Sequence, residues 1–263
     1  MRGFGEIAER LRRSTVEVRI PGERGGGSGV VWNAGGLIVT NAHVARASDT
    51  EVDLWDGRRI PGRVVSRDAR RDLALLNITA SNLEPATPGD SAALRPGELV
   101  MAVGSPLGFA GALSRGAVHS IGPIDGMGTR PWIRAGVRLA PGNSGGPLAN
   151  ARGEVIGINT AIVNGLGVAI PSNRAVDFVE RGPLPSLGVA LRPVRLGLLL
   201  LDVDSAGAAA NASLKPGDTL LLSLDELNGA LDSGGEVLRL RFLRESKIRE
   251  TYVQLARRRA EAA

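Results

Sequence analysis

Ser144 is the residue of this sequence that most clearly suggests chemistry, because glycines surround it in the segment Gly142-Asn143-Ser144-Gly145-Gly146. Small neighbours let the backbone turn sharply and let a substrate carbonyl group approach the hydroxyl closely. A serine hydroxyl becomes a nucleophile when a histidine accepts its proton and an acid orients that histidine. The chain contains two histidines, His43 and His119, and both precede Ser144.

The order of these residues along the chain separates the enzyme folds that share such a serine motif. In the α/β-hydrolase fold the histidine follows the serine, so that fold is excluded. The subtilisin order, acid before histidine, fails for His43 because no aspartate precedes it. His119 lies in a strand-like setting without a supporting motif, and we interpret it as a surface or structural residue. The chymotrypsin-like order of histidine, aspartate and serine is satisfied by His43, Asp72 and Ser144.

Each of these three residues stands beside an apolar run of strand length. His43 follows Leu37-Ile38-Val39, Asp72 opens the run Leu73 to Leu76, and Ser144 lies in a loop ahead of further β-type sequence. Strand ends hold polar side chains at the edge of a buried core. The sequence therefore predicts that strand ends position His43 and Asp72, and that a loop presents Ser144.

The wider pattern indicates a mainly β fold. Short apolar runs separated by Gly, Pro, Asn or Asp continue to about residue 170, as a barrel or sandwich requires; they include Val16 to Ile20, Val30 to Trp32, Leu99 to Val103, Val155 to Ile158 and Val168 to Ile170. Two helices are expected beside them. The first covers residues 3 to 13, and the second covers residues 173 to 181. The segment Gly182-Pro183-Leu184-Pro185-Ser186 then predicts a domain boundary.

Composition excludes several function classes. The chain has 263 residues, a net charge of +5 and no cysteine, so disulfides, thiolate metal clusters and thiol nucleophiles are excluded. Basic residues are scattered, with short clusters only at Arg10 to Arg13 and Arg257 to Arg259, which argues against nucleic-acid binding. Two histidines do not suffice for a zinc site, and no cofactor is expected. No run approaches the roughly 18 apolar residues of a membrane span.

Gly25 to Gly29 is the one glycine-rich stretch that resembles a phosphate-binding loop. No Lys-Ser or Lys-Thr pair follows it and no helix is expected after it. We interpret it as a tight turn before a strand.

The motifs around the three candidate residues resemble those of the HtrA (DegP-like) serine proteases. The segments that carry the resemblance are Thr40-Asn41-Ala42-His43-Val44, Arg71-Asp72-Leu73-Ala74-Leu75-Leu76 and Gly142-Asn143-Ser144-Gly145-Gly146-Pro147-Leu148. Further similar segments are Gly27 to Val31, Val103 to Gly108, Gly157 to Ala161 and Val168 to Ser172. The resemblance implies a chymotrypsin-like double β-barrel protease domain over residues 1 to 183.

The resemblance also implies a mechanism. His43 would act as general base and acid, Asp72 would orient it, and Ser144 would attack the scissile carbonyl. An oxyanion hole would form from the loop Gly142, Asn143 and Ser144, with the Gly142 and Ser144 N–H groups as donors and Asn143 shaping the turn.

The chain departs from the family just before the nucleophile. The family usually has Asp-Ala-Ala-Ile-Asn-Pro there, whereas this chain has Gly136-Val137-Arg138-Leu139-Ala140-Pro141. The altered loop leaves two functions open. One is an active endopeptidase that cleaves unfolded or misfolded proteins after small or medium aliphatic residues, in protein quality control. The other is a catalytically silent, peptide-binding or chaperone-like homologue.

Residues 186 to 257 resemble a reduced, small α+β PDZ domain. The supporting segments are Leu187-Gly188-Val189, Leu196-Gly197-Leu198-Leu199 and Leu214-Lys215-Pro216-Gly217-Asp218. By this resemblance Leu196, Gly197 and Leu198 would form the loop that binds a peptide carboxylate. A Gly-containing strand and turn usual in the family are missing after Leu222, which predicts impaired peptide binding.

The resemblance further implies partners and a compartment. Partners would be unfolded proteins or peptides and further copies of the chain, as a homotrimer or higher homo-oligomer, in which Phe4 either joins a trimer contact or belongs to a helix that caps the barrel. The family is extracytoplasmic, in the periplasm or cell envelope. The first residues carry no apolar stretch of signal-peptide length, which leaves a cytoplasmic location open.

Overall fold

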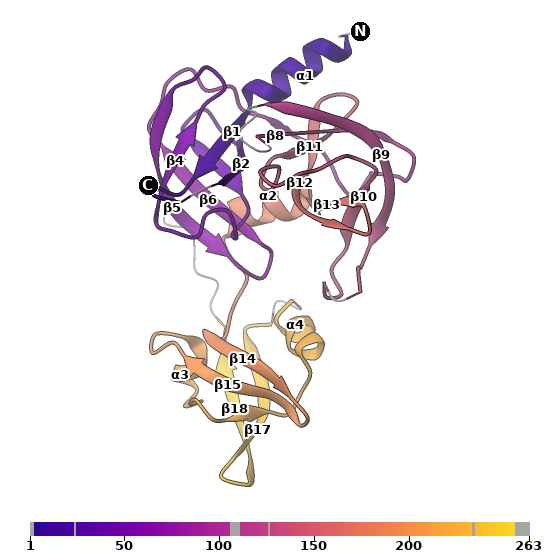
Figure 1. The fold of residues 1–263 in the computed structure, drawn as a ribbon. Coiled ribbons are helices and arrows are strands. Elements are labelled where there is room, and N and C mark those ends of the chain that lie inside the picture. The colour runs from indigo at the N-terminus through magenta and orange to yellow at the C-terminus, as the bar shows by residue number, and fades with distance from the viewer. Residues whose placement is uncertain (1–2, 24, 106–110, 126, 233–234, 256–263) are drawn as a thin grey trace. The chain divides into compact units, whose positions relative to one another are not determined.

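The computed structural model describes residues 3–23, 25–105, 111–125, 127–232 and 235–255 (Figure 1). The described chain divides into two compact units. The first runs to Gly182, apart from Asp125 and residues 127–129, which group with the second unit that begins at Pro183. The end of the motif that begins at Val103 and the basic cluster at 257–259 lie outside the described residues. Within the described ranges, no helix is long and apolar enough to cross a membrane.

The first barrel of the first unit is closed, with strand order β1-β2-β3-β6-β5-β4. Its strands are β1 (Thr15–Arg19), β2 (Gly26–Val31), β3 (Leu37–Thr40), β4 (Asp49–Asp53), β5 (Arg59–Asp68) and β6 (Leu73–Ile78). Alternate apolar side chains such as Val16, Val18 and Ile38 point into the barrel and are buried.

The second barrel has the order β11-β8-β9-β10-β13-β12 and is closed by pairing of β11 with β12. Its strands are β8 (Leu99–Gly104), β9 (Ala112–Gly122), β10 (Trp132–Ala135), β11 (Pro147–Asn150), β12 (Glu154–Val163) and β13 (Leu166–Pro171), with β7 (Thr87–Pro88) parallel to β12. The expected mainly β, double-barrel fold is confirmed. Helix α2 (Ser172–Arg181) follows and buries Phe178.

Helix α1 (Phe4–Arg13) precedes the first barrel and packs through Ile7 and Leu11, which are buried. Their spacing of four residues puts them on one face of the helix, whereas Phe4 is 49% exposed. Glu9 accepts hydrogen bonds from Arg12 and Arg13, and these bonds lower the pKa of Glu9 to about 2. The packing of Ile7 and Leu11 explains why this helix forms, and the trimer contact of Phe4 stays a prediction.

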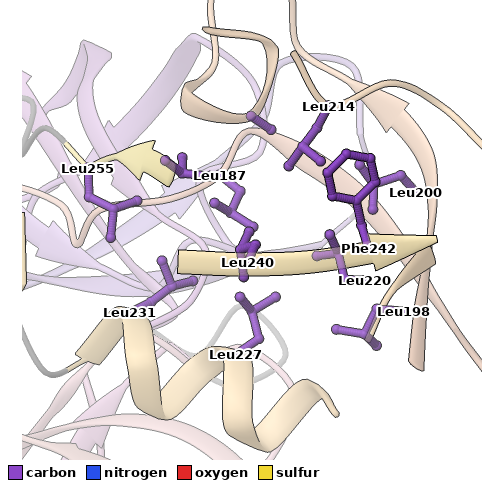
Figure 2. Close-up of a cluster of buried hydrophobic side chains, with 12 residues drawn as sticks. Leu187, Leu198, Leu200, Leu214, Leu220, Leu227, Leu231, Leu240, Phe242 and Leu255 are labelled. Carbon is purple, nitrogen blue, oxygen red and sulfur yellow. The ribbon is translucent and has the colours of Figure 1, made fainter. Parts of the chain in front are cut away.

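The second unit contains a five-stranded sheet of order β14-β15-β16-β17-β18. The elements are β14 (Val189–Val194), β15 (Gly197–Val203), α3 (Ala208–Asn211), β16 (Thr219–Leu220), α4 (Leu224–Asp232), β17 (Val237–Arg244) and β18 (Lys247–Gln254). Figure 2 shows its core, which consists mostly of leucine side chains from the sheet and from α4.

Strand β16 ends at Leu220, although the apolar run continues to Leu222. The reason is the next element: Ser223 caps helix α4, because its hydroxyl accepts a hydrogen bond from the Glu226 N–H while the Glu226 carboxylate accepts from the Ser223 N–H. This reciprocal capping box begins the helix at Leu224 and ends the extended segment early.

Candidate active site

His43 and Asp72 meet because their flanking strands are antiparallel neighbours. Strands β3 and β6 pair so that Thr40 lies opposite Ala74, which places the residues after β3 beside those before β6. The Nδ1 atom of His43 lies 2.8 Å from Oδ2 and 2.9 Å from Oδ1 of Asp72, and the His43 backbone N–H also donates to Oδ1 at 3.0 Å. The carboxylate thus fixes both the ring and the backbone of His43, and directs Nε2 away from Asp72.

The backbone of Asp72 adopts a left-handed conformation with φ of 55°, which is uncommon for a residue other than glycine. The Asn41 side-chain amide donates to the Asp72 carbonyl oxygen at 2.9 Å. The preceding residue, Arg71, is buried and forms ion pairs with Asp68 and with Asp177 of α2. These contacts on both sides hold Asp72 in its strained conformation.

Thr160 connects the two barrels at the site, a position whose role sequence reasoning missed. Its hydroxyl donates to Asp72 Oδ2 at 2.6 Å, and its carbonyl oxygen accepts a hydrogen bond from Ser144 Oγ at 3.0 Å. The signal was present, because Thr160 lies in a segment that resembles the family, but nothing in that segment indicates which of its residues meets the carboxylate. The structure therefore brings His43, Asp72 and Ser144 together through a fourth residue.

The loop that carries Ser144 is fixed by backbone hydrogen bonds to both barrels. The Ser144 carbonyl oxygen accepts from the Ser28 N–H at 2.7 Å, and the Gly145 N–H donates to the Asn159 carbonyl at 2.8 Å. Gly145 has a φ of +87°, and a Cβ there would lie 2.0 Å from the Ser28 carbonyl oxygen. Only glycine fits at this position, which explains the glycine that follows the serine.

The residues before Ser144 form a β-turn whose type decides where the Gly142 N–H points. The Asn143 N–H donates to the Ala140 carbonyl at 3.0 Å, and Gly142 has a φ of +104°. Proline cannot adopt a positive φ, so Pro141 excludes a type I′ turn and the turn is type II. The central peptide of this turn joins Pro141 to Gly142, and its plane is flipped in a type II turn relative to a type I turn. The Gly142 N–H therefore points to the side that the Pro141 carbonyl would occupy in a type I turn.

Two backbone amides beside the Ser144 hydroxyl remain available to a ligand. Neither the Gly142 N–H nor the Ser144 N–H donates to another of the described residues. The Gly142 carbonyl is held away by the Ser28 hydroxyl, which donates to it at 2.6 Å. Asn143 differs from its neighbours, because its N–H closes the turn and its side chain is buried.

Among the hydrogen bonds of the described residues, none joins His43 Nε2 to Ser144 Oγ. The hydroxyl donates to Thr160 instead, and rotation about its Cα–Cβ bond is needed to present the proton to the imidazole. Such contacts are often loose before substrate binds. His43 and Ser144 nevertheless line one cavity of about 380 Å³, together with Gly142.

Comparison with known proteins places this geometry in a family. The sequence matches the trypsin-like peptidase domain over residues 27–158. The chain belongs to the HtrA family of trypsin-like serine proteases. It is 37% identical over 243 residues to a "Probable periplasmic serine endoprotease DegP-like" from Halomonas elongata, covering 81% of this chain and 50% of that protein. A protein of the same description from Marinomonas is 39% identical over 79% of this chain and 43% of its own length.

Solved protease structures also resemble the chain. An "HtrA-type protease AlgW with tripeptide" superimposes with a TM-score of 0.68 at 26% identity, covering 97% of both chains. A serine endoprotease from Yersinia pestis gives a TM-score of 0.67 at 26% identity, covering 97% of this chain and 98% of the other. The chain spans about half of the length of the sequence relatives that it matches.

The segment in which this HtrA chain departs from its family is held against β9. The Gly136 N–H donates to the Ala117 carbonyl at 2.9 Å, and the Arg138 N–H donates to the Ser114 hydroxyl at 2.8 Å. Gly116 makes the approach close, because a Cβ there would lie 2.2 Å from the Gly136 carbonyl oxygen. The unusual sequence thus has its own attachment to the second barrel.

The structure places Leu196, Gly197 and Leu198, the predicted carboxylate loop, at the hairpin between β14 and β15. They line a cavity of about 390 Å³ with residues that precede α4. At this point β15 pairs with β14 on one edge and with β16 on the other. The unpaired edge near this hairpin, among the described strands, therefore belongs to β14.

Proposed function

We propose that this chain is a serine endopeptidase that hydrolyses peptide bonds in unfolded or misfolded proteins. The observation that carries the proposal is that hydrogen bonds link His43, Asp72 and Ser144, with Thr160 joining the acid to the serine. Beside them, the backbone N–H groups of Gly142 and Ser144 donate to none of the described residues and can bind a substrate oxygen. A nucleophile, a base, an orienting acid and an oxyanion site are the parts that acyl transfer needs.

In the first half of the reaction Ser144 Oγ attacks the scissile carbonyl carbon while His43 Nε2 accepts the hydroxyl proton. The carbonyl oxygen becomes an oxyanion and accepts hydrogen bonds from the Gly142 and Ser144 N–H groups. The C–N bond then breaks, His43 gives its proton to the leaving amine, and an acyl-enzyme remains on Ser144. In the second half water attacks this ester, again with His43 as base, and releases the new carboxylate and Ser144.

Asp72 and Thr160 act through His43 in this proposal. Asp72 accepts the Nδ1 proton, so the lone pair of the neutral ring lies on Nε2, and the carboxylate stabilises the imidazolium that forms. The Thr160 hydroxyl donates to the same carboxylate and keeps one of its oxygens aimed at the ring. The Thr160 hydroxyl has a positioning role, because it contacts Asp72 and acts through His43.

The alternative is a catalytically silent homologue that only binds peptides, which the altered segment before Pro141 motivates. The type II turn supports the active enzyme, because the Gly142 N–H then takes the side that the Pro141 carbonyl would take in a type I turn, and it donates to no other of the described residues. Losing one oxyanion donor typically costs about 2.7–4 kcal/mol of transition-state stabilisation, so a reversed turn would slow hydrolysis by roughly 10²–10³-fold.

Unfolded casein tests the proposal directly. We expect wild-type protein to cleave casein and Ser144→Ala to leave it intact under the same conditions. Equal and negligible cleavage by both proteins would favour the silent homologue.

The proposal also covers the cellular location, the oligomeric state and the peptide partners of the chain. The relatives described as periplasmic support an extracytoplasmic location, and the family supports a homotrimer or higher homo-oligomer and cleavage after small or medium aliphatic residues.

In the second unit we place peptide binding at the unpaired edge of β14, with the hairpin at Leu196 to Leu198 beside it. Gel filtration with light scattering measures the oligomer, and a peptide titration of a β14 variant tests the edge.

A further inference from the structure

Ser28 lies in the glycine-rich strand β2 of the first barrel, but its side chain points out of that barrel. A Cβ on the next residue, Gly29, would lie 2.7 Å from a methyl group of Ile38, which belongs to the barrel core. Successive side chains of a strand point to opposite faces, so the Ser28 hydroxyl faces away from this core. The residue is nevertheless fully buried, because the second barrel covers it.

The Ser28 hydroxyl connects two segments of the second barrel. It donates to the Gly142 carbonyl at 2.6 Å and accepts from the Ser105 N–H at 2.9 Å. Glycines make room for it, because a Cβ on Gly104 would lie 3.0 Å from Ser28 Oγ and one on Gly146 would lie 3.2 Å from Ser28 Cβ. A hydroxyl that accepts one hydrogen bond donates a stronger one, so the Ser105 N–H strengthens the bond to Gly142.

The backbone of Ser28 is held by the strands and loops of the catalytic residues. Its N–H donates to the Ser144 carbonyl at 2.7 Å, and its carbonyl accepts from the Thr40 hydroxyl, at the end of β3, at 2.6 Å. All polar groups of Ser28 are therefore engaged, and the hydroxyl has a fixed position from which to hold Gly142.

The bond from Ser28 fixes a peptide plane beside the Gly142 N–H. In the peptide that joins Gly142 to Asn143, the N–H donates to the Ala140 carbonyl and the carbonyl oxygen accepts from Ser28. Gly142 adopts a φ of +104° and has no side chain to restrict its conformation. Hydrogen bonds to its neighbours must therefore determine where its own N–H points.

We propose that Ser28 is a positioning residue of the oxyanion site. Its hydroxyl holds Gly142 in the conformation whose N–H binds the oxygen of the scissile carbonyl in the transition state. The inference rests on the proposed endopeptidase function and adds a residue of the first barrel to a site whose two donors, Gly142 and Ser144, belong to the second. Ser28 reaches the reacting oxygen only through Gly142.

A peptide ester and the thionoester of the same peptide test this role. Sulfur is larger than oxygen and accepts hydrogen bonds weakly, so donors placed for an oxyanion stabilise the thionoester reaction much less. The ester-to-thionoester ratio of kcat/KM therefore measures the oxyanion site. Both substrates are measured on one enzyme sample, so the ratio does not depend on the folded fraction.

Ser28→Ala removes the hydroxyl without adding any atom to the packed junction. We expect it to lower the ratio by about tenfold, less than the roughly 10²–10³-fold that loss of a whole oxyanion donor costs. The ester should slow while the thionoester changes little. An unchanged ratio in Ser28→Ala would overturn the proposal.

Ser172→Ala is the matched control, because Ser172 is also fully buried and its hydroxyl also donates to a carbonyl, that of Gly89, at 2.6 Å. It should leave the ratio unchanged, and an equal fall in this variant would contradict the role of Ser28. Ser28→Cys keeps the shape of the side chain with a weaker donor and serves if Ser28→Ala does not fold. Its ratio should lie below that of wild type, and an unchanged ratio would again overturn the proposal.

Wild-type protein distinguishes the two levels of failure. If it hydrolyses neither ester above the background of Ser144→Ala, the endopeptidase is disproved, and the role of Ser28 with it. If it hydrolyses the ester and Ser28→Ala shows the same ratio, only the role of Ser28 is disproved.

Discussion

The two units differ in how completely their backbone groups are paired. In the first unit two closed barrels leave no free edge within either ring, and the candidate site lies where residues from both barrels bond to one carboxylate. The second unit is an open sheet whose outer strands, β14 and β18, each pair on one edge among the described strands. Closed barrels suit chemistry that needs fixed distances, whereas an open sheet edge suits peptide binding.

The largest effect should follow from changing the acid in the first unit. Asp72→Asn keeps the size of the side chain but loses its charge and the acceptor that selects the His43 tautomer. We expect kcat to fall by about 10⁴-fold, the scale seen for this change in related triads. Steady-state cleavage of a peptide measures it, with circular dichroism as the folding control. A fall of less than tenfold would show that Asp72 does not orient His43.

A pair of core truncations, one in each unit, tests whether the units are independent. Leu76→Ala and Leu227→Ala remove the same atoms from fully or almost fully buried positions, and each should cost about 2–5 kcal/mol of local stability. We expect Leu76→Ala to lower both stability and peptide hydrolysis, and Leu227→Ala to destabilise only the second unit.

Limited proteolysis followed by mass spectrometry shows which unit unfolds, and the rate of short-peptide hydrolysis measures the activity of the candidate site in the first unit. Loss of short-peptide hydrolysis in Leu227→Ala, with a protected first unit, would contradict independence.

A smaller effect is expected at Thr160, the connection between the barrels. Thr160→Val removes the hydroxyl that donates to Asp72 and keeps the shape of the side chain. A hydrogen bond to a charged group contributes about 1.5–3 kcal/mol, so kcat should fall by about 10- to 100-fold with little change in KM.

Thr160→Ser is the matched control, because it retains the hydroxyl and should recover most of the activity. Equal losses in the two variants would show that the methyl group matters and that the hydrogen bond to Asp72 does not.

The smallest effect concerns helix α1, at the edge of the first unit. Arg12 and Arg13 lower the pKa of Glu9 to about 2, below the value of about 4.3 for an unfolded chain. A group whose pKa is lower in the folded state stabilises that state above the unfolded pKa, and the contribution is lost as pH falls toward about 2.

Stability measured between pH 5 and pH 2 should therefore fall less steeply in Glu9→Gln than in wild type, by a small amount because Glu9 is exposed. Identical pH dependence of the two proteins would show that the pairs with Arg12 and Arg13 do not stabilise the helix.

Sequence reasoning recovered the fold where apolar runs are short and bounded by turn residues. Strands β3, β6, β8, β12 and β13 were expected at their observed places, and so were helices α1 and α2. Strand β5 was not expected, and β9 was indicated only by the strand-like setting of His119. Both strands mix apolar residues with charged, polar and small ones and are held by pairing with neighbouring strands on each side, which is a tertiary effect that local pattern does not contain.

At the site, residue order and flanking motifs predicted which side chains to examine, and the structure added how they are joined. Thr160 was missed because a hydroxyl in a β-strand gives no sign of the carboxylate that it meets from another barrel. The type of the turn at Gly142 could also not be predicted from the sequence. Its hydrogen bond and positive φ, combined with Pro141, were needed to determine its type.

The central claim is that Ser144 is a competent nucleophile in the resting chain, despite the altered segment before Pro141. Intact-mass measurement after incubation with a fluorophosphonate, without added peptide, tests this claim most directly. We predict one adduct, located on Ser144 by fragmentation, and no adduct in His43→Ala, which lacks the base. Wild-type protein that is folded by circular dichroism and remains unlabelled would contradict the account.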